Sequence, residues 1–95
     1  MNIQEYIIII EPTKTGFSAY SPDLQGCITV GETVEQTREN MEEAIELYLE
    51  ELVESGENIP APSKLKDQIN TLEGLQSGTF IAFIPNHIGV HIKSA

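Results

Sequence analysis

The 95-residue sequence has little cysteine, few basic residues and no long apolar run. Its single cysteine cannot form an internal disulfide, which excludes a disulfide-stapled fold. The richest apolar runs, residues 6–10 and 80–84, are far shorter than the roughly 18 residues of a membrane span. Met1 leads directly into a strand-like pattern, without the basic and apolar segments of a secretory signal. These absences predict a cytoplasmic protein with one domain over residues 1–95.

Basic residues are the scarcest charged class, and this shortage constrains the partners. The chain has 5 Lys and Arg against 15 Asp and Glu, a formal net charge of −10 at pH 7. Nucleic-acid binding depends on neutralising phosphates with Lys and Arg, so we expect no direct binding of nucleic acid. A metal site built from Cys27, His87 and His91 would lack any recognised ligand spacing, so we expect no metal or other cofactor.

Short apolar segments separated by Gly and Pro predict a sheet. Residues 3–10, 17–20, 28–30 and 79–84 read as strands, the third beginning after a bend at Gly26. The first and last of these are apolar at odd and even positions alike, which is typical of strands covered on both faces. Residues 88–92 could extend the last strand or form another.

A long amphipathic helix is predicted over residues 34–55. Thr33 and Gln36 match a capping box, in which the Thr hydroxyl accepts from an amide of the first turn and the Gln side chain reaches back to the cap amide. Apolar residues then recur at spacings of three and four, and Gly56 is suited to close the helix. The expected fold is α+β, a β-β-β-α-β single-sheet layer with one long helix.

The chain after the helix offers little further cover for the sheet. Pro60 and Pro62 mark a surface connector, and residues 64–72 predict one or two helical turns. One long helix covers one face of a sheet, whereas two strands are apolar on both faces. We therefore expect a homo-oligomer that forms through the open face or the C-terminal strand.

The stretch S-P-D-L-Q-G-C, residues 21–27, places a carboxylate four residues before the only thiol. A nucleophilic cysteine needs a base and an electropositive setting, and the charges near Cys27 are acidic. A nuclease with two metal ions would need converging carboxylates, and the only candidates, Glu5, Glu11 and Asp23, show no such spacing. We expect no catalytic residues, and we interpret the stretch as a structural corner with Asp23 accepting backbone amides.

The same stretch carries a family resemblance. An aromatic residue is followed by Pro-Asp-Leu, Gly-Cys and Gly-Glu-Thr, and then by a predicted helix with Glu43-Ala44-Ile45 and a Pro-x-Pro-Ser connector. Over about residues 6–63 this pattern resembles the HicB-like antitoxin family. The residues that carry this structural motif are Tyr20, Pro22, Asp23, Leu24, Gly26, Cys27, Gly31 and Thr33.

The resemblance implies a degraded ribonuclease-H-like layer and an antitoxin. Such a protein would neutralise a small basic HicA-like toxin that cleaves RNA, by direct protein–protein contact. After Ser63 there is no room for two consecutive helices, so no C-terminal DNA-binding domain is recognised. The alternative is a stand-alone oligomeric interaction module of this family without a toxin partner.

The predicted helix carries a row of four glutamates at intervals of four residues: Glu42, Glu46, Glu50 and Glu54. Like charges at this spacing repel one another by a few tenths of a kcal/mol per pair. The row is either a solvated face or a docking surface for a cationic partner, whose encounter it would steer. We take it as the hypothetical partner-binding site.

Overall fold

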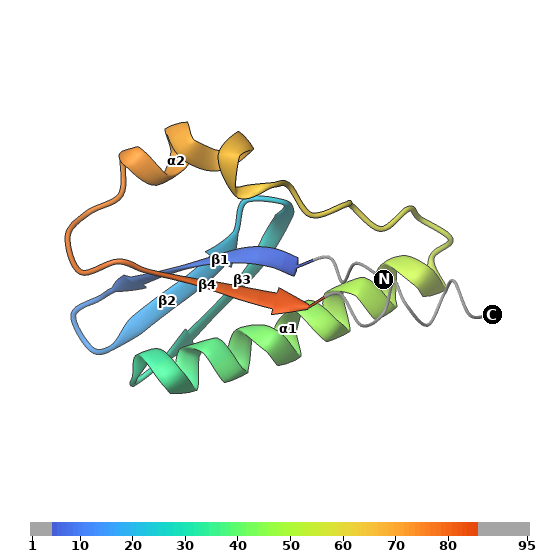
Figure 1. Cartoon of the computed structure of the whole chain (residues 1–95). Coiled ribbons are helices and arrows are strands. Elements are labelled where there is room, and N and C mark those ends of the chain that lie inside the picture. Colours follow the sequence, from blue (N-terminus) through green and yellow to red (C-terminus); the bar gives the residue numbers. More distant parts are fainter. Residues whose placement is uncertain (1–4, 86–95) are drawn as a thin grey trace.

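The computed structural model describes residues 5–85 and shows one four-stranded antiparallel sheet with a long helix on one face (Figure 1). Strands β1 (Glu5–Pro12), β2 (Phe17–Ser21) and β3 (Leu24–Gly31) precede helix α1 (Val34–Glu54). The short helices η1 (Leu65–Gln68) and α2 (Ile69–Glu73) and strand β4 (Phe80–Pro85) follow. The strand order is β3-β2-β1-β4, which confirms the predicted α+β fold. The segment 88–92 lies outside the described residues.

β1 forms the centre of the molecule because both of its faces are apolar. Tyr6, Ile8 and Ile10 point toward α1 and join the core cluster that contains Met41, Ile45 and Leu49 of the helix. These side chains are at most 2% exposed. The spacing of four between the helix residues places them on one stripe, and this stripe fixes how α1 lies on the sheet.

The second face of β1 is also buried within the single chain. Ile7 and Ile9 are 1% and 0% exposed, although they point away from α1. Figure 1 shows the chain after α1 crossing to the side of the sheet opposite the helix, where α2 lies. The centre of this face is therefore covered without a second copy, and the expected homo-oligomer stays a prediction. The cover is limited to the centre of this face, which also carries exposed apolar side chains nearer the sheet edges: Ile28, Val30, Ile81 and Phe83.

β3 begins four residues earlier than predicted. The strand runs from Leu24 rather than from Ile28, and Gly26 lies inside it with φ of 83°. A register shift at Tyr20 and Ser21 marks a bulge in the pairing with β2. The bend at Gly26 therefore redirects the strand without ending it, because a bulge absorbs the irregular residue while the pairing continues.

Both ends of α1 are capped. Thr33 Oγ1 accepts the amide of Gln36 at 3.0 Å. The Gln36 side chain accepts from the amide of Glu32 at 2.9 Å, one residue before the cap residue that the capping-box pattern indicated. At the other end Gly56 has φ of 74°, and the amides of Gly56 and Glu57 donate back to the last turn at 3.1 and 2.9 Å. This is a Schellman closure, which explains why the helix stops here.

Candidate functional site

The corner between β2 and β3 holds the connector that follows α1. Pro22 and Asp23 form the turn of this hairpin. Asp23 Oδ2 accepts the amide of Ser63 at 2.7 Å, and Oδ1 accepts the Ser63 hydroxyl at 2.5 Å. The carboxylate therefore accepts a backbone amide, but one that lies 40 residues along the chain rather than in its own turn. Hydrogen bonds therefore join the two parts of the family pattern, the corner and the Pro-x-Pro-Ser connector.

Tyr6 provides a second attachment for the same connector. Its side chain is fully buried, and its hydroxyl donates to the carbonyl oxygen of Pro60. Burial raises the pKa of Tyr6 to about 12, and the negative charge of Asp23 adds to this effect. Together Tyr6 and Asp23 hold the connector across one end of the sheet. This path leads the chain from the α1 face to the opposite face.

Cys27 has none of the features of a reactive thiol. Its side chain is 5% exposed and belongs to the core cluster, and burial raises the pKa of the thiol. A raised pKa disfavours the thiolate, which is the nucleophilic form. We propose that the whole motif is structural. The remaining motif residues lie on the same hairpin and at the start of the helix: Tyr20 in β2, Leu24, Gly26 and Gly31 in β3, and Thr33 at the cap of α1.

Gly31 shows a contact that the sequence did not reveal. A Cβ atom at this position would lie 2.4 Å from Thr37 Oγ1, inside van der Waals distance. Thr37 is fully buried in α1, and its hydroxyl donates to the carbonyl oxygen of Thr33 at 2.7 Å. Glycine is therefore required here because β3 and the first turn of α1 touch.

The three acids of the nuclease alternative do not converge. Glu5 and Glu11 lie at opposite parts of β1, separated by six strand residues or about 20 Å. Asp23 is engaged with Ser63. Among the described residues no group of three or more His, Cys, Asp or Glu is placed to hold a metal ion. His87 and His91 lie outside the described part of the chain.

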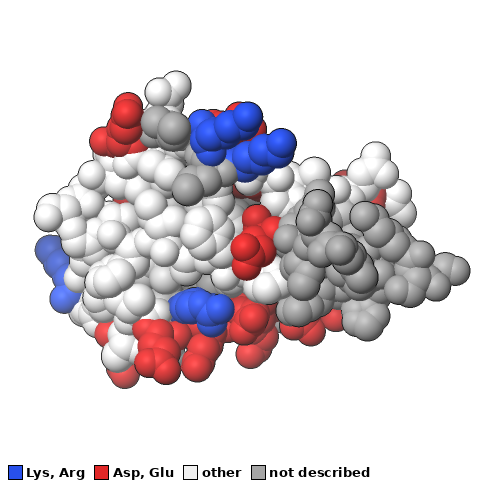
Figure 2. All heavy atoms as spheres, in the orientation of Figure 1, with Lys and Arg blue, Asp and Glu red and all other residues white. Residues whose placement is uncertain are grey.

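The acidic row lies along the outer side of α1. Thr37, Met41, Ile45 and Leu49 mark the buried face, and the exposed side chains of Glu46, Glu50 and Glu54 lie away from it, with Glu42 half-buried at its margin. The row extends over three intervals of four residues, about 18 Å. Figure 2 shows acidic side chains gathered on the α1 side of the molecule.

No helix within residues 5–85 is both long and apolar enough to cross a membrane.

An exposed leucine accompanies this row. Leu47 is 58% exposed on α1, with Glu43 four residues before it and Glu50 and Glu51 three and four residues after it. Residues at these spacings are neighbours on a helix surface. The acidic face therefore contains an apolar side chain framed by carboxylates. The sequence carried a signal for this, because Leu47 falls outside the periodic apolar positions of the helix.

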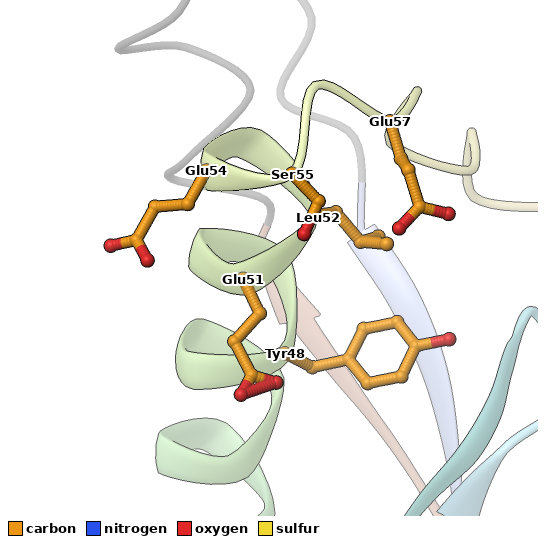
Figure 3. Close-up of a pocket in the computed structure, with 6 residues that line it drawn as sticks. All are labelled: Tyr48, Glu51, Leu52, Glu54, Ser55 and Glu57. Carbon is orange, nitrogen blue, oxygen red and sulfur yellow. The ribbon is translucent and has the colours of Figure 1, made fainter.

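The C-terminal end of α1 forms an open hollow of about 480 Å³, lined by Tyr48, Glu51, Leu52, Glu54, Ser55 and Glu57 (Figure 3). The Tyr48 hydroxyl donates to the carbonyl oxygen of Gln25 at 3.0 Å. Figure 3 shows Glu54 on the side of the helix away from the Tyr48 ring. The lining contains carboxylates but no thiol or imidazole, at the helix end where the dipole is negative. The negative charge of these carboxylates favours contact with a cationic group.

Comparison with known proteins connects this geometry to a family. Residues 6–86 match the family model described as the HicB_like antitoxin of bacterial toxin-antitoxin systems. The chain is 32% identical over 68 residues to an uncharacterized 14.9 kDa protein from the rep-hol intergenic region of Haemophilus phage HP1. This alignment covers 72% of the chain and 51% of the phage protein, so the chain spans about half the length of that relative.

Two solved structures share the fold. One is a HicA3 and HicB3 toxin-antitoxin complex, in which the matched chain is 31% identical with a TM-score of 0.69. The other is the N-terminal domain of the antitoxin HicB from Burkholderia pseudomallei, 27% identical with a TM-score of 0.67. Each alignment covers 84% of this chain and 94% of the matched chain.

Proposed function

Because this chain belongs to the HicB-like antitoxin family, we propose that it neutralises a small basic HicA-like toxin that cleaves RNA, by direct contact with the toxin. The similar HicB3 chain was solved together with HicA3, which supports a toxin as the partner class. A non-enzymatic role agrees with this family and with the dispersed acids of the sheet.

The observation that carries the proposal is the acidic face of α1. Glu46, Glu50 and Glu54 are exposed along one row, and the framed Leu47 adds an apolar contact. A toxin that binds RNA must present basic groups to the phosphates. Carboxylates spaced about 6 Å apart along the helix can pair with these basic groups in place of the RNA phosphates. Inhibition is then stoichiometric, with one site on the antitoxin blocking one RNA-binding surface.

The charged and apolar parts of this face have different kinetic roles. Charges around an interface act mainly on the association rate, and salt screens them over about 8 Å at physiological ionic strength. A buried apolar anchor acts mainly on the dissociation rate. The glutamate row therefore sets how fast the complex forms, and Leu47 contributes to how long it lasts.

The experiment uses the toxin recovered from the native host with this chain as bait and identified as a small basic protein that cleaves RNA. The test variant replaces Glu42, Glu46, Glu50 and Glu54 with Gln. The matched control neutralises four exposed acids off α1: Glu5→Gln, Glu32→Gln, Asp67→Asn and Glu73→Gln. Both variants change the formal net charge from −10 to −6, so only the position of the charge differs.

We expect the α1 variant to associate roughly tenfold more slowly at low salt and to lose most of its salt dependence, because electrostatic steering is reduced. The control should keep most of its on-rate, and Leu47→Ala should raise the off-rate. Equal on-rates for the two quadruple variants would show that the glutamate row of α1 is not part of the toxin interface. Recovery of no basic RNA-cleaving protein would favour the stand-alone interaction module.

A further inference from the structure

Two attachments hold the chain that follows α1, and they lie in different surroundings. At Pro60 the carbonyl oxygen accepts from the Tyr6 hydroxyl, and the neighbouring Ile59 packs against the core cluster on the α1 side of the sheet. At Ser63 the amide and the hydroxyl donate to the Asp23 carboxylate. Pro60 is therefore anchored in the core, whereas Ser63 marks the point at which the chain leaves for the second face. We call residues 63–78 the strap.

The strap itself has few other attachments. Its helices η1 and α2 have 4 and 5 residues, too few to be stable without packing, and α2 lacks a side-chain cap at its start. Within residues 63–78, the backbone hydrogen bonds outside these helices are local, and none of them joins the strap to a strand. No strap side chain that the structure describes is fully buried. Segments with so few buried contacts open at a lower free energy than the whole domain.

The strap covers the middle of a largely apolar row on the second face of the sheet. This row crosses all four strands in register, as Ile28, Tyr20, Ile9 and Ile81. Its two ends are 66% and 44% exposed, whereas Ile9 is 0% exposed. Within residues 5–85, Figure 1 shows α2 on this side of the sheet, opposite α1. The strap therefore closes a row that is open at both ends.

We propose that the strap opens as a unit while the sheet and α1 stay folded, with Asp23 as its latch, and that this opening controls access to the middle of the apolar row. In the closed state the Asp23 carboxylate holds the amide and the hydroxyl of Ser63. In the open state both bonds are broken, Pro60 stays bound to Tyr6, and Ile9 is exposed. The strap and the acidic face of α1 lie on opposite sides of the sheet, so this device goes beyond the proposed function.

Hydrogen exchange of the unmodified chain tests whether the strap opens separately. The Ser63 amide and the helical amides of α2 should be protected, but at least about tenfold less than the slowest amides of β1. Their exchange should also respond less to low concentrations of urea, because the opening exposes less surface than unfolding does. Equal protection of the strap and β1 would show that the two open only together, and an unprotected Ser63 amide would show that the latch is not closed. Either result would overturn the proposal.

Two variants identify the latch. Asp23→Ala removes a contact that is broken in the open state, so exchange of the strap amides should accelerate at least about tenfold. Tyr6→Phe removes a contact that the open state retains, so exchange of the strap should stay nearly unchanged while that of β1 accelerates. Asp67→Ala removes an exposed acid of the strap itself and should change neither. Unchanged strap exchange in Asp23→Ala, or equal acceleration of the strap in Tyr6→Phe, would exclude Asp23 as the latch.

Thiol labelling measures the exposure of the apolar row directly. In a Cys27→Ala background, a single thiol is introduced by Ile9→Cys on the strap side of β1 or by Ile8→Cys on the α1 side. Both positions are 0% exposed, and they are adjacent in one strand, so the control is matched in residue type and burial. We expect iodoacetamide to react at least about tenfold faster with the Ile9→Cys chain, because this reaction requires only the strap to open. Equal rates at the two positions would contradict the proposal. None of these measurements involves a toxin, so their outcome is separate from that of the toxin experiment.

Discussion

The attachment of the connector to Asp23 gives a quantitative prediction. Asp23→Ala removes the acceptor of two hydrogen bonds, from the amide and the hydroxyl of Ser63. A hydrogen bond to a charged group contributes about 1.5 to 3 kcal/mol, and two bonds that share one carboxylate are not additive. We expect the free energy of unfolding to fall by about 2 to 4 kcal/mol. For a domain of this size that lowers the Tm by roughly 10 to 20 °C.

Urea denaturation of Asp23→Ala, Ser63→Ala and the double variant measures the bond between the two side chains directly. The cycle should give a coupling energy of about 1 to 2 kcal/mol, because Ser63→Ala leaves its own amide bond to Asp23 in place. Asp67→Ala is the control, since it removes an exposed acid of η1. A coupling energy near zero, or equal stability of the Asp23 and Asp67 variants, would refute the structural role of this contact.

Two further predictions concern buried side chains. Tyr6 has a pKa of about 12 in the folded chain, above its ordinary value of 10.0, so its contribution to stability is complete below pH 10 and is lost as the pH rises toward 12. Urea melts across this range should show the loss, and Tyr6→Phe should remove most of it; an unchanged pH dependence in that variant would assign the effect elsewhere. Cys27→Ala should lower the free energy of unfolding by only about 1 kcal/mol, because the truncation is small. Toxin binding measured on the folded Cys27→Ala chain should be intact, and its loss would give the corner a functional role.

Local patterns were sufficient to predict the elements of this fold. The alternating and continuous apolar runs indicated β1, β2 and β4, and the spacing of three and four indicated α1 with its ends at Thr33 and Gly56. These signals are reliable because each depends on the periodicity or capping of a single segment. The start of β3 was misplaced, because a glycine bend inside a strand and one that ends it look alike in sequence.

The acidic row could also be predicted from spacing alone, since positions four apart share a helix face. Leu47 was missed as part of this surface. Its position outside the periodic apolar stripe was a signal for exposure, but only the structure shows how far the side chain is exposed.

The sequence by itself determined the α+β class, the position of the long helix and the family pattern. Only the tertiary structure decided what joins distant segments: Asp23 with Ser63, Tyr6 with Pro60, and the cover over Ile7 and Ile9. It also decided that side chains of α1 donate hydrogen bonds to backbone carbonyl oxygens of β3. Hydrogen-bond partners 40 and 54 residues apart leave no local periodicity, because they depend on the path of the whole chain and not on the pattern of any one segment.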